Sequence, residues 1–437
     1  MSDPAARGYA QVGPIAIVSH SHPSLTKGGA EIAAYTLFTG LMRLGCDVTF
    51  IAACSEASRS KLSLASARER VVFTDPTAFD SFHHLATPAM VKSILSVLPR
   101  HTRVVNFHHF IHFGLGVLRE VGANLGAVSV LTLHELLSIC HHHGQMITRG
   151  ANALCTRATP TACTQCFPEH TRQEFALRRQ AFLEAYRCLD GFISPSRFLL
   201  ERYVSWGLDR ERLKVIENGL PHREHVSPGR QHGPYVFGFF GQINPFKGVD
   251  TILRAAEALS RSGEASDRIR IRIHGNFIGQ SQSFIDRFMK LLEQLPFLSF
   301  SGPYDNSQVG QLMAECDYVL VPSVWWENSP VVIQEAFAAR RPVICTGIGG
   351  MAEKVVDEVS GLHFRRNDHA DLVSQMLRAA DEATFERLQG GIPRVMGSEG
   401  MALKYLHAYL QFRARKLSTE EDEVEDSDNE PRAQAGA

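Results

Sequence analysis

Residues 317–345, DYVLVPSVWWENSPVVIQEAFAARRPVIC, hold the pattern that decides the fold. The first eight residues form an apolar run that is typical of a buried parallel strand. The chain then turns, and Ser329 is a good N-cap for a helix over residues 330–340, with Pro330 at its first position. Pro342 begins the next strand. The order strand, helix, strand is typical of an α/β sheet.

The same stretch places two glutamates, Glu327 and Glu335, eight positions apart. Glu327 is expected on the loop that leaves the strand, and Glu335 about one turn into the helix, near its positive end. Open parallel sheets bind ligands at this edge, and helix N-termini favour phosphates. The two carboxylates therefore suit a nucleotide sugar, one for sugar hydroxyls and the other for the ribose diol. The alternative is that both glutamates are ordinary surface charges, because this spacing is common.

The whole chain limits the class of protein. Its 437 residues predict two domains, and its net charge of −1 argues for no nucleic-acid partner. The N-terminal MSDPAARGYAQVGP lacks the apolar core of a signal peptide, and no apolar stretch is long enough to span a bilayer. We therefore expect a cytoplasmic protein. Several basic residues could contact the inner face of a membrane, although ordinary solvated charge is the favoured interpretation. They are Arg340, Arg341, Arg413, Arg415 and Lys416.

Short apolar runs divide the chain into two α/β halves. The first half has expected strands at residues 14–20, 47–53, 103–107, 127–134, 191–195 and 214–220, and helices at 30–45 and 171–189. The second half has expected strands at residues 235–241, 271–275, 298–302, 318–324 and 343–347. The polar segment between them, residues 221–234, is expected to be a linker.

These elements predict four parts of the chain. Residues 1–222 form an N-terminal domain with a cysteine-containing insertion at about 138–170, and residues 223–400 form a C-terminal domain. Residues 401–417 form a last helix. Residues 418–437 form an acidic tail that we expect to be disordered and solubilising, since eight of the residues from Glu420 to Glu430 are acidic and none is basic.

This layout, together with the two glutamates, resembles the retaining family 4 glycosyltransferases of the GT-B fold. The resemblance covers roughly residues 14–417 and implies two Rossmann-like domains facing across a cleft. It implies that the N-terminal domain binds a saccharide or lipid-linked acceptor and the C-terminal domain a nucleotide-diphosphate sugar. A role in cell-envelope polysaccharide or glycoconjugate synthesis follows from the resemblance alone.

The resemblance also implies roles for glycines and charges at the expected cleft. Gly28 and Gly29, in a loop before a helix, are expected to approach the donor diphosphate. Lys247 matches the cation that neutralises the leaving diphosphate, but Gln242 stands where the family has an arginine. A neutral amide binds a diphosphate more weakly than a guanidinium does. For Gly28 and Gly29 the alternative is an ordinary flexible loop. For Gln242, either Lys247 supplies more of the neutralising charge or another cation replaces the missing arginine.

The remaining candidate residues lie at the ends of other strands. His134, in VLTLHE, is expected to contact the transferred sugar, although a structural histidine is the alternative. For His108, His109 and His112 the structural role is favoured over acceptor binding. Backbone groups near Gly349-Gly350, Gly275-Asn276 and Pro303-Tyr304 are expected near the donor. The full set of candidate donor-binding residues is Gly28, Gly29, Gln242, Lys247, Asn328, Ser329, Glu335 and Tyr304.

Four of the nine cysteines fall in the polar insertion beside His141, His142 and His143. They are Cys140, Cys155, Cys163 and Cys166, and the last two form a C-x2-C pair that suits a metal. A structural zinc or iron–sulfur site is one interpretation. Reduced thiols are slightly favoured, because only one pair has strong spacing. No catalytic metal or other cofactor is expected.

The sequence therefore predicts a retaining, nucleotide-sugar-dependent hexosyl or related transferase with His134, Glu327 and Lys247 as catalytic residues. Lys247 would stabilise the leaving diphosphate, Glu327 would hold sugar hydroxyls, and Glu335 would bind the ribose. Front-face attack, in which the departing phosphate takes the acceptor proton, is implied by the resemblance. Two alternatives stay open: a GT-B epimerase acting on a nucleotide sugar, and a degenerate GT-B binding module, which Gln242 favours.

Overall fold

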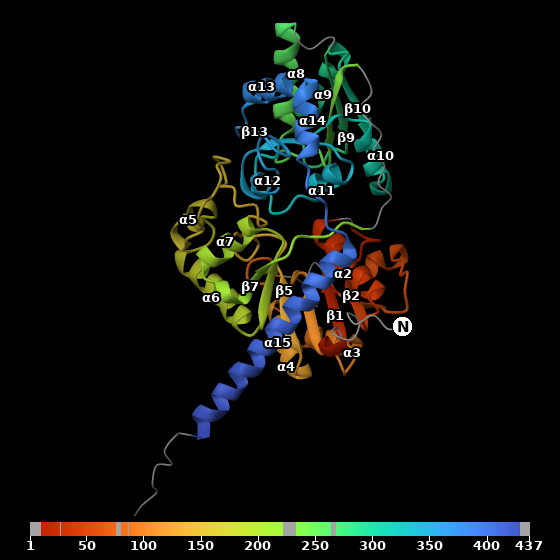
Figure 1. The fold of residues 1–437 in the computed structure, drawn as a ribbon. Helices are drawn as coiled ribbons and strands as arrows, with labels where there is room; N and C mark the ends of the chain where they lie inside the picture. Colours follow the sequence, from red (N-terminus) through yellow and green to blue (C-terminus); the bar gives the residue numbers. More distant parts are fainter. Residues whose placement is uncertain are drawn as a thin grey trace, which may run out of the picture.

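The computed structural model describes residues 10–26, 28–75, 80–85, 87–221, 233–263 and 268–428. Within these ranges the chain forms two parallel β-sheets, each covered by helices on both faces (Figure 1). The two Rossmann-like α/β domains expected from the sequence are thus present. The predicted linker falls largely on residues 222–232, which lie outside the described ranges.

The N-terminal sheet has the strand order β3-β2-β1-β4-β5-β6-β7 among the described residues. Its strands are β1 (Ile15–Ser19), β2 (Val48–Cys54), β3 (Glu69–Phe73), β4 (Val104–Phe107), β5 (Val128–Thr132), β6 (Gly191–Ser194) and β7 (Leu213–Val215). Its helices are α2 (Gly29–Arg43), α3 (Pro88–Val97), α4 (Leu115–Leu125), α5 (Pro160–Cys166), α6 (Arg172–Arg187) and α7 (Arg197–Trp206). The order reverses between β1 and β4, so this is the switch point at which α/β sheets bind ligands.

The C-terminal sheet has the order β10-β9-β8-β11-β12-β13 among the described residues. Its strands are β8 (Tyr235–Phe240), β9 (Ile269–His274), β10 (Leu298–Gly302), β11 (Tyr318–Val321), β12 (Val343–Thr346) and β13 (Gly361–Phe364). Its helices are α8 (Val249–Ser262), α9 (Gln282–Gln294), α10 (Val309–Ala314), α11 (Val331–Ala338), α12 (Gly349–Lys354), α13 (His369–Ala379) and α14 (Glu382–Gly390). Here the switch point lies between β8 and β11.

The last helix, α15 (Ser398–Asp428), returns to the N-terminal domain (Figure 1). Its buried side chains from Met401 to Phe412 pack with α2 and with one face of the N-terminal sheet. The helix continues eleven residues beyond the expected end at Leu417. Part of the tail that we expected to be disordered is therefore helical, because the acidic run contains good helix formers and no proline before Pro431. Residues 429–437 lie outside the described ranges.

Other elements also differ from the sequence expectations, and the strand expected at 214–220 is limited to β7. The sequence analysis missed β3 and β13, which are short edge strands, and β3 mixes charged with apolar residues. The helix after Glu327 begins at Val331, with Pro330 as its N-cap residue and no side-chain cap. The predicted cap is wrong because the hydroxyl of Ser329 instead accepts a hydrogen bond from the Nζ of Lys354 at 3.0 Å.

None of the described helices combines the length and apolar character needed to cross a membrane.

Candidate active site

Two loops meet at the switch point of the C-terminal sheet, one after β8 and one after β11. The backbone N–H of Val324 donates to the carbonyl of Phe246 at 2.8 Å. Gly248 has a φ of +73°, and a Cβ there would lie 1.9 Å from the carbonyl oxygen of Pro322. Only glycine fits this conformation and this approach. The contact fixes Lys247, on the first loop, beside Glu327, on the second.

The Glu327 carboxylate is held through one of its two oxygens. Oε1 accepts hydrogen bonds from the Nζ of Lys247 at 2.6 Å, from the Oγ of Ser323 at 2.8 Å and from the Nε1 of Trp325 at 2.8 Å. No described residue donates to Oε2, and this oxygen is not among the fully buried atoms without a partner. The carboxylate is therefore fixed at one oxygen and has a second oxygen available to accept a hydroxyl.

The surroundings of Glu327 keep it ionised. Its side chain is 11% exposed, and burial by itself would raise its pKa. The positive charge and hydrogen bond of Lys247, with the bonds from Trp325 and Ser323, outweigh burial and lower the pKa of Glu327 below its ordinary value. The site thus combines an ionised acceptor with an adjacent ammonium group.

Two aromatic residues that the sequence analysis did not single out complete this arrangement. The rings of Phe246 and Trp325 stack at 5.4 Å with an interplanar angle of 13°. The Nζ of Lys247 lies 5.5 Å from the centroid of the Trp325 ring. Trp325 therefore holds both charged groups, Glu327 by its N–H and Lys247 by its ring face. The paired tryptophans directly before Glu327 were the only signal of this role in the sequence.

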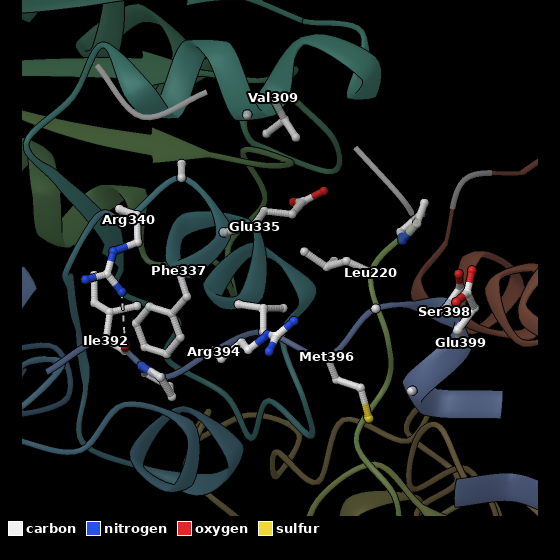
Figure 2. A pocket seen from close by; sticks show the side chains of 18 of the residues that line it. Leu220, Val309, Glu335, Phe337, Arg340, Ile392, Arg394, Met396, Ser398 and Glu399 are labelled. Carbon is white, nitrogen blue, oxygen red and sulfur yellow. Dashed lines mark hydrogen bonds between the residues drawn. The ribbon is translucent and has the colours of Figure 1, made fainter. Parts of the chain in front are cut away.

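Glu335 lies apart from this pair. It is 8% exposed and points into a cavity of about 810 Å³ at the junction of the two domains, between Val309 and Leu220 (Figure 2). The segment from Ile392 to Gly400 lines the opposite side of this cavity. Neither Lys247 nor Glu327 lines it. The ribose-binding role of Glu335 stays a prediction.

Three other predicted donor-binding residues, Gly28, Gln242 and Tyr304, lie on the loops that follow β1, β8 and β10. Gly28 is the N-cap of α2 and makes no side-chain cap, so the first amides of this helix begin at Gly29. Gln242 is exposed, with its Oε1 3.5 Å from the Nδ2 of Asn244. Tyr304 packs edge-on against Phe240 at a ring distance of 5.9 Å. Their roles toward a donor stay predictions.

His134 lies in the N-terminal domain, shortly after β5. Its Nε2 lies 2.9 Å from the Nδ1 of His108, and one of these nitrogens carries the shared proton. Burial, followed by the neighbouring His108, lowers the pKa of His134 well below its ordinary value, and burial lowers that of His108 to about 3. Both rings are therefore neutral at physiological pH. No described residue bonds the Nδ1 of His134, so that nitrogen remains available to a ligand.

The structure joins His134 to the glutamate loop across the domains. The Nδ2 of Asn328 donates to the backbone carbonyl of His134 at 3.0 Å. Sequence reasoning could not show this contact, because the two residues are 194 positions apart.

Further histidines and carboxylates surround His134 at this edge of the N-terminal sheet. His20 lies 3.4 Å from Glu31, and His109 lies 3.2 Å from Glu135, between ring and carboxylate atoms. Burial would raise the pKa of Glu31, but its bond to His20 and other contacts lower it to about 2. His108 is fully buried and His112 is partly exposed, so a structural role fits His108 best.

The four cysteines of the insertion are free thiols that lie near one another. Burial, with the charges of Cys140, Cys155 and Cys166, raises the pKa of Cys163 to about 12. Burial also raises the pKa of Cys140 to about 11. No three His, Cys, Asp or Glu side chains in the described part of the chain are arranged to hold a metal. The structural metal therefore stays a prediction that has yet to be tested.

Alkylation with iodoacetamide at pH 7.5 should distinguish these thiols. Cys188 is the exposed cysteine and should react first, whereas Cys140, with a pKa near 11, should react about 100-fold more slowly, because only the thiolate is nucleophilic. Mass spectrometry of tryptic peptides over time measures both rates. Equal rates would contradict the burial argument, and faster labelling of the insertion after a chelator is added would support a bound metal.

Comparisons with known proteins match both halves of the chain. Residues 27–224 match the family model described as Glycosyltransferase Family 4, and residues 222–388 match the model described as Glycosyl transferases group 1. A D-inositol 3-phosphate glycosyltransferase of Nocardia farcinica is 28% identical over 216 residues, which cover 47% of each chain. The enzyme of the same name from Salinispora tropica is 34% identical over 205 residues, covering 42% of this chain and 41% of that one. The chain thus spans about half the length of the curated relatives it matches.

Solved structures share the whole fold at low sequence identity. HepE of Anabaena in complex with UDP is 17% identical, with a TM-score of 0.63 over 93% of this chain and 100% of that chain. Sucrose-phosphate synthase from Thermosynechococcus elongatus is also 17% identical, with a TM-score of 0.67 over 92% of this chain and 100% of that chain. These likenesses confirm the GT-B fold predicted from the sequence.

Proposed function

We propose that this chain, which belongs to the family 4 and group 1 glycosyltransferases, transfers a sugar from a nucleotide-diphosphate sugar to a saccharide or lipid-linked acceptor, with retention of configuration. One observation supports this most directly. Glu327 is fixed at Oε1 by three donors, keeps Oε2 available to a hydroxyl, and lies 2.6 Å from the ammonium group of Lys247. A sugar diphosphate needs both groups: an acceptor for its hydroxyls and a cation for its diphosphate.

In this proposal the C-terminal domain holds the donor. Lys247 stabilises the negative charge that develops on the departing diphosphate, which is usually the largest catalytic contribution. Gln242 adds amide hydrogen bonds, and the first amides of α2, from Gly28 and Gly29 onward, face the phosphates. Glu327 Oε2 accepts a hydroxyl of the transferred sugar close to its anomeric carbon. The charge that Gln242 lacks leaves Lys247 with a larger share of the electrostatic work.

The N-terminal domain presents His134 and the acceptor. The available Nδ1 of His134 bonds a hydroxyl of the transferred sugar on the side opposite Glu327. The acceptor hydroxyl attacks the anomeric carbon from the face that the diphosphate leaves, and the departing phosphate oxygen takes its proton. The new glycosidic bond forms as the anomeric carbon–oxygen bond to phosphate breaks, so the configuration is retained. The neutral imidazole of His134 positions the sugar and does not repel the cationic character of the reacting carbon.

UDP-sugars are the first donors to test, because the Anabaena relative of the same fold was solved with UDP and with UDP-glucose. The acceptors to test are simple saccharides and inositol phosphates, the latter because the curated relatives are named for D-inositol 3-phosphate. Incubation with each donor–acceptor pair, followed by NMR of the product, reads both transfer and anomeric configuration. An inverted product contradicts retention. An altered donor sugar without acceptor supports the epimerase alternative, and binding without any product supports the binding module.

Glu335→Ala and His134→Ala should affect different kinetic constants. Loss of a ribose contact weakens donor binding in both the ground state and the transition state, so Glu335→Ala should raise the donor KM about tenfold with little change in kcat. His134→Ala should lower kcat about 10- to 100-fold with a similar KM, because its contact acts near the reacting carbon. Initial rates of nucleotide release over a range of donor concentrations separate these effects. Wild-type kinetics in either variant contradicts the role given to that residue.

A further inference from the structure

The loop that carries Glu327 is bound to the other domain on both sides of this residue. On one side the indole Nε1 of Trp326 donates to the carbonyl of Cys155 at 3.0 Å. On the other side the amide of Asn328 donates to the carbonyl of His134 at 3.0 Å. Cys155 lies in the insertion of the N-terminal domain, and His134 follows β5. The two immediate neighbours of Glu327 therefore both bond to the backbone of the acceptor-side domain.

Trp326 is also packed into the N-terminal domain. Its ring centroid lies 5.3 Å from that of Phe198 and 4.6 Å from the guanidinium carbon of Arg202, both on α7. It contacts the hydrophobic core of that domain as a partly buried member. The cation over the indole and the adjacent aromatic ring both restrict the movement of the indole. The backbone of Trp326 is therefore part of the C-terminal domain, whereas its side chain packs against the N-terminal domain.

We infer that Trp326 and Asn328 are positioning residues that set the Glu327 carboxylate relative to His134 when the two domains are in contact. The inference rests on the proposed function. Each of the two hydrogen bonds joins atoms of different domains, so neither can exist once the domains separate. The orientation of Glu327 toward the sugar is therefore coupled to closure over the donor, and a small displacement of such a group is costly for turnover.

A contact elsewhere on the same interface provides a matched control. The carboxylate of Glu353, on α12, accepts the backbone N–H groups of Arg197 and Phe198 at 2.7 and 2.6 Å. It caps the start of α7 across the domains and makes no hydrogen bond to the glutamate loop among the described residues. Glu353→Gln therefore alters one interdomain contact while the hydrogen bonds of Trp326 and Asn328 to the N-terminal domain stay in place.

Conservative variants are chosen so that a loss of activity reflects the missing hydrogen bond and not unfolding of the protein. Trp326→Phe retains an aromatic ring against Phe198 and Arg202 but loses the indole N–H. Asn328→Ala removes an amide whose Oδ1 is buried without a partner, so its deletion leaves only one carbonyl unpaired. Thermal denaturation of each variant and of Glu353→Gln, compared with wild type, checks that the fold is intact.

Hydrogen–deuterium exchange without any ligand, and release of UDP from UDP-glucose, test the inference. Trp326→Phe and Asn328→Ala should each speed exchange of the 323–329 segment about tenfold and lower kcat about 10- to 100-fold, with the donor KM within about threefold. Glu353→Gln should leave the exchange of that segment and kcat within about twofold of wild type. The inference would be overturned if Trp326→Phe and Asn328→Ala showed the same exchange rate and the same kcat as Glu353→Gln. If the wild type releases no UDP, the proposed donor is wrong. The exchange rate of the 323–329 segment in the variants then tests by itself whether Trp326 and Asn328 position the loop.

Discussion

Replacing Lys247 by alanine should lower the rate of sugar transfer by about 100- to 1000-fold. The ammonium group is the cation that the structure places beside Glu327, at 2.6 Å, and Gln242 supplies no charge where the family has an arginine. The negative charge on the departing diphosphate would then develop without a counter-charge from this loop. Initial rates of nucleotide release, at saturating donor, measure the loss.

Two further variants show whether this loss is electrostatic. Lys247→Arg keeps the charge and should recover part of the rate, although the longer planar group cannot reproduce the geometry of the ammonium. Lys290→Ala removes an exposed lysine from α9 and should leave the rate unchanged. A rate for Lys247→Ala within threefold of wild type would exclude Lys247 as the group that stabilises the leaving diphosphate.

Replacing Arg178 by alanine should destabilise the N-terminal domain by about 3–5 kcal/mol. This guanidinium is 3% exposed and donates to the carbonyls of Phe82, Ser138 and Leu137 at 2.9, 2.7 and 2.6 Å. Its removal leaves all three carbonyls without their donor in a buried setting. It also lies 4.7 Å from the ring of Phe182, so a cation–π contact is lost as well.

The neighbouring residue is the matched control for this prediction. Arg179 is exposed and donates to a single carbonyl, that of Trp206, at 2.7 Å. Arg179→Ala should cost no more than about 1 kcal/mol. Urea denaturation followed by circular dichroism, with each transition analysed separately, compares the two variants. Equal losses in both would show that stability does not depend on the bonds from Arg178 to the carbonyls of Phe82, Ser138 and Leu137.

The sequence predicted the two sheets well because their central strands are continuous apolar runs. Residues 317–324 and 127–134 are examples, and each contains an observed strand. The edge strand β3 was missed because it mixes charged with apolar residues, and β13 because its four residues, GLHF, are too short a run to form a clear apolar pattern. The start of α11 was misplaced because Ser329 bonds Lys354, a tertiary contact that overrides local capping preference.

The sequence indicated which residues lie at the site better than it indicated the contacts between them. Lys247 and Glu327 were both expected at the donor side, and the structure brings them into contact. The indole of Trp325, the bond from Asn328 to His134 and the packing of Trp326 on α7 depend on how distant loops meet. Such contacts leave no periodic signal in the sequence, whereas a strand or a helix does. Glu335 was expected to bind the ribose of the same donor as Glu327; it lines a cavity whose lining does not include Glu327, and its role stays a prediction.

Thermal stability with UDP, GDP, ADP, CMP and dTDP, measured for wild type and for Lys247→Ala, tests most directly the claim that the Lys247–Glu327 pair is the donor site. One nucleotide, present at about 100 times its dissociation constant, should stabilise the wild type by about 2.7 kcal/mol. That stabilisation should be largely lost in Lys247→Ala. Stabilisation by none of the five nucleotides, or an equal effect in wild type and variant, would contradict the account.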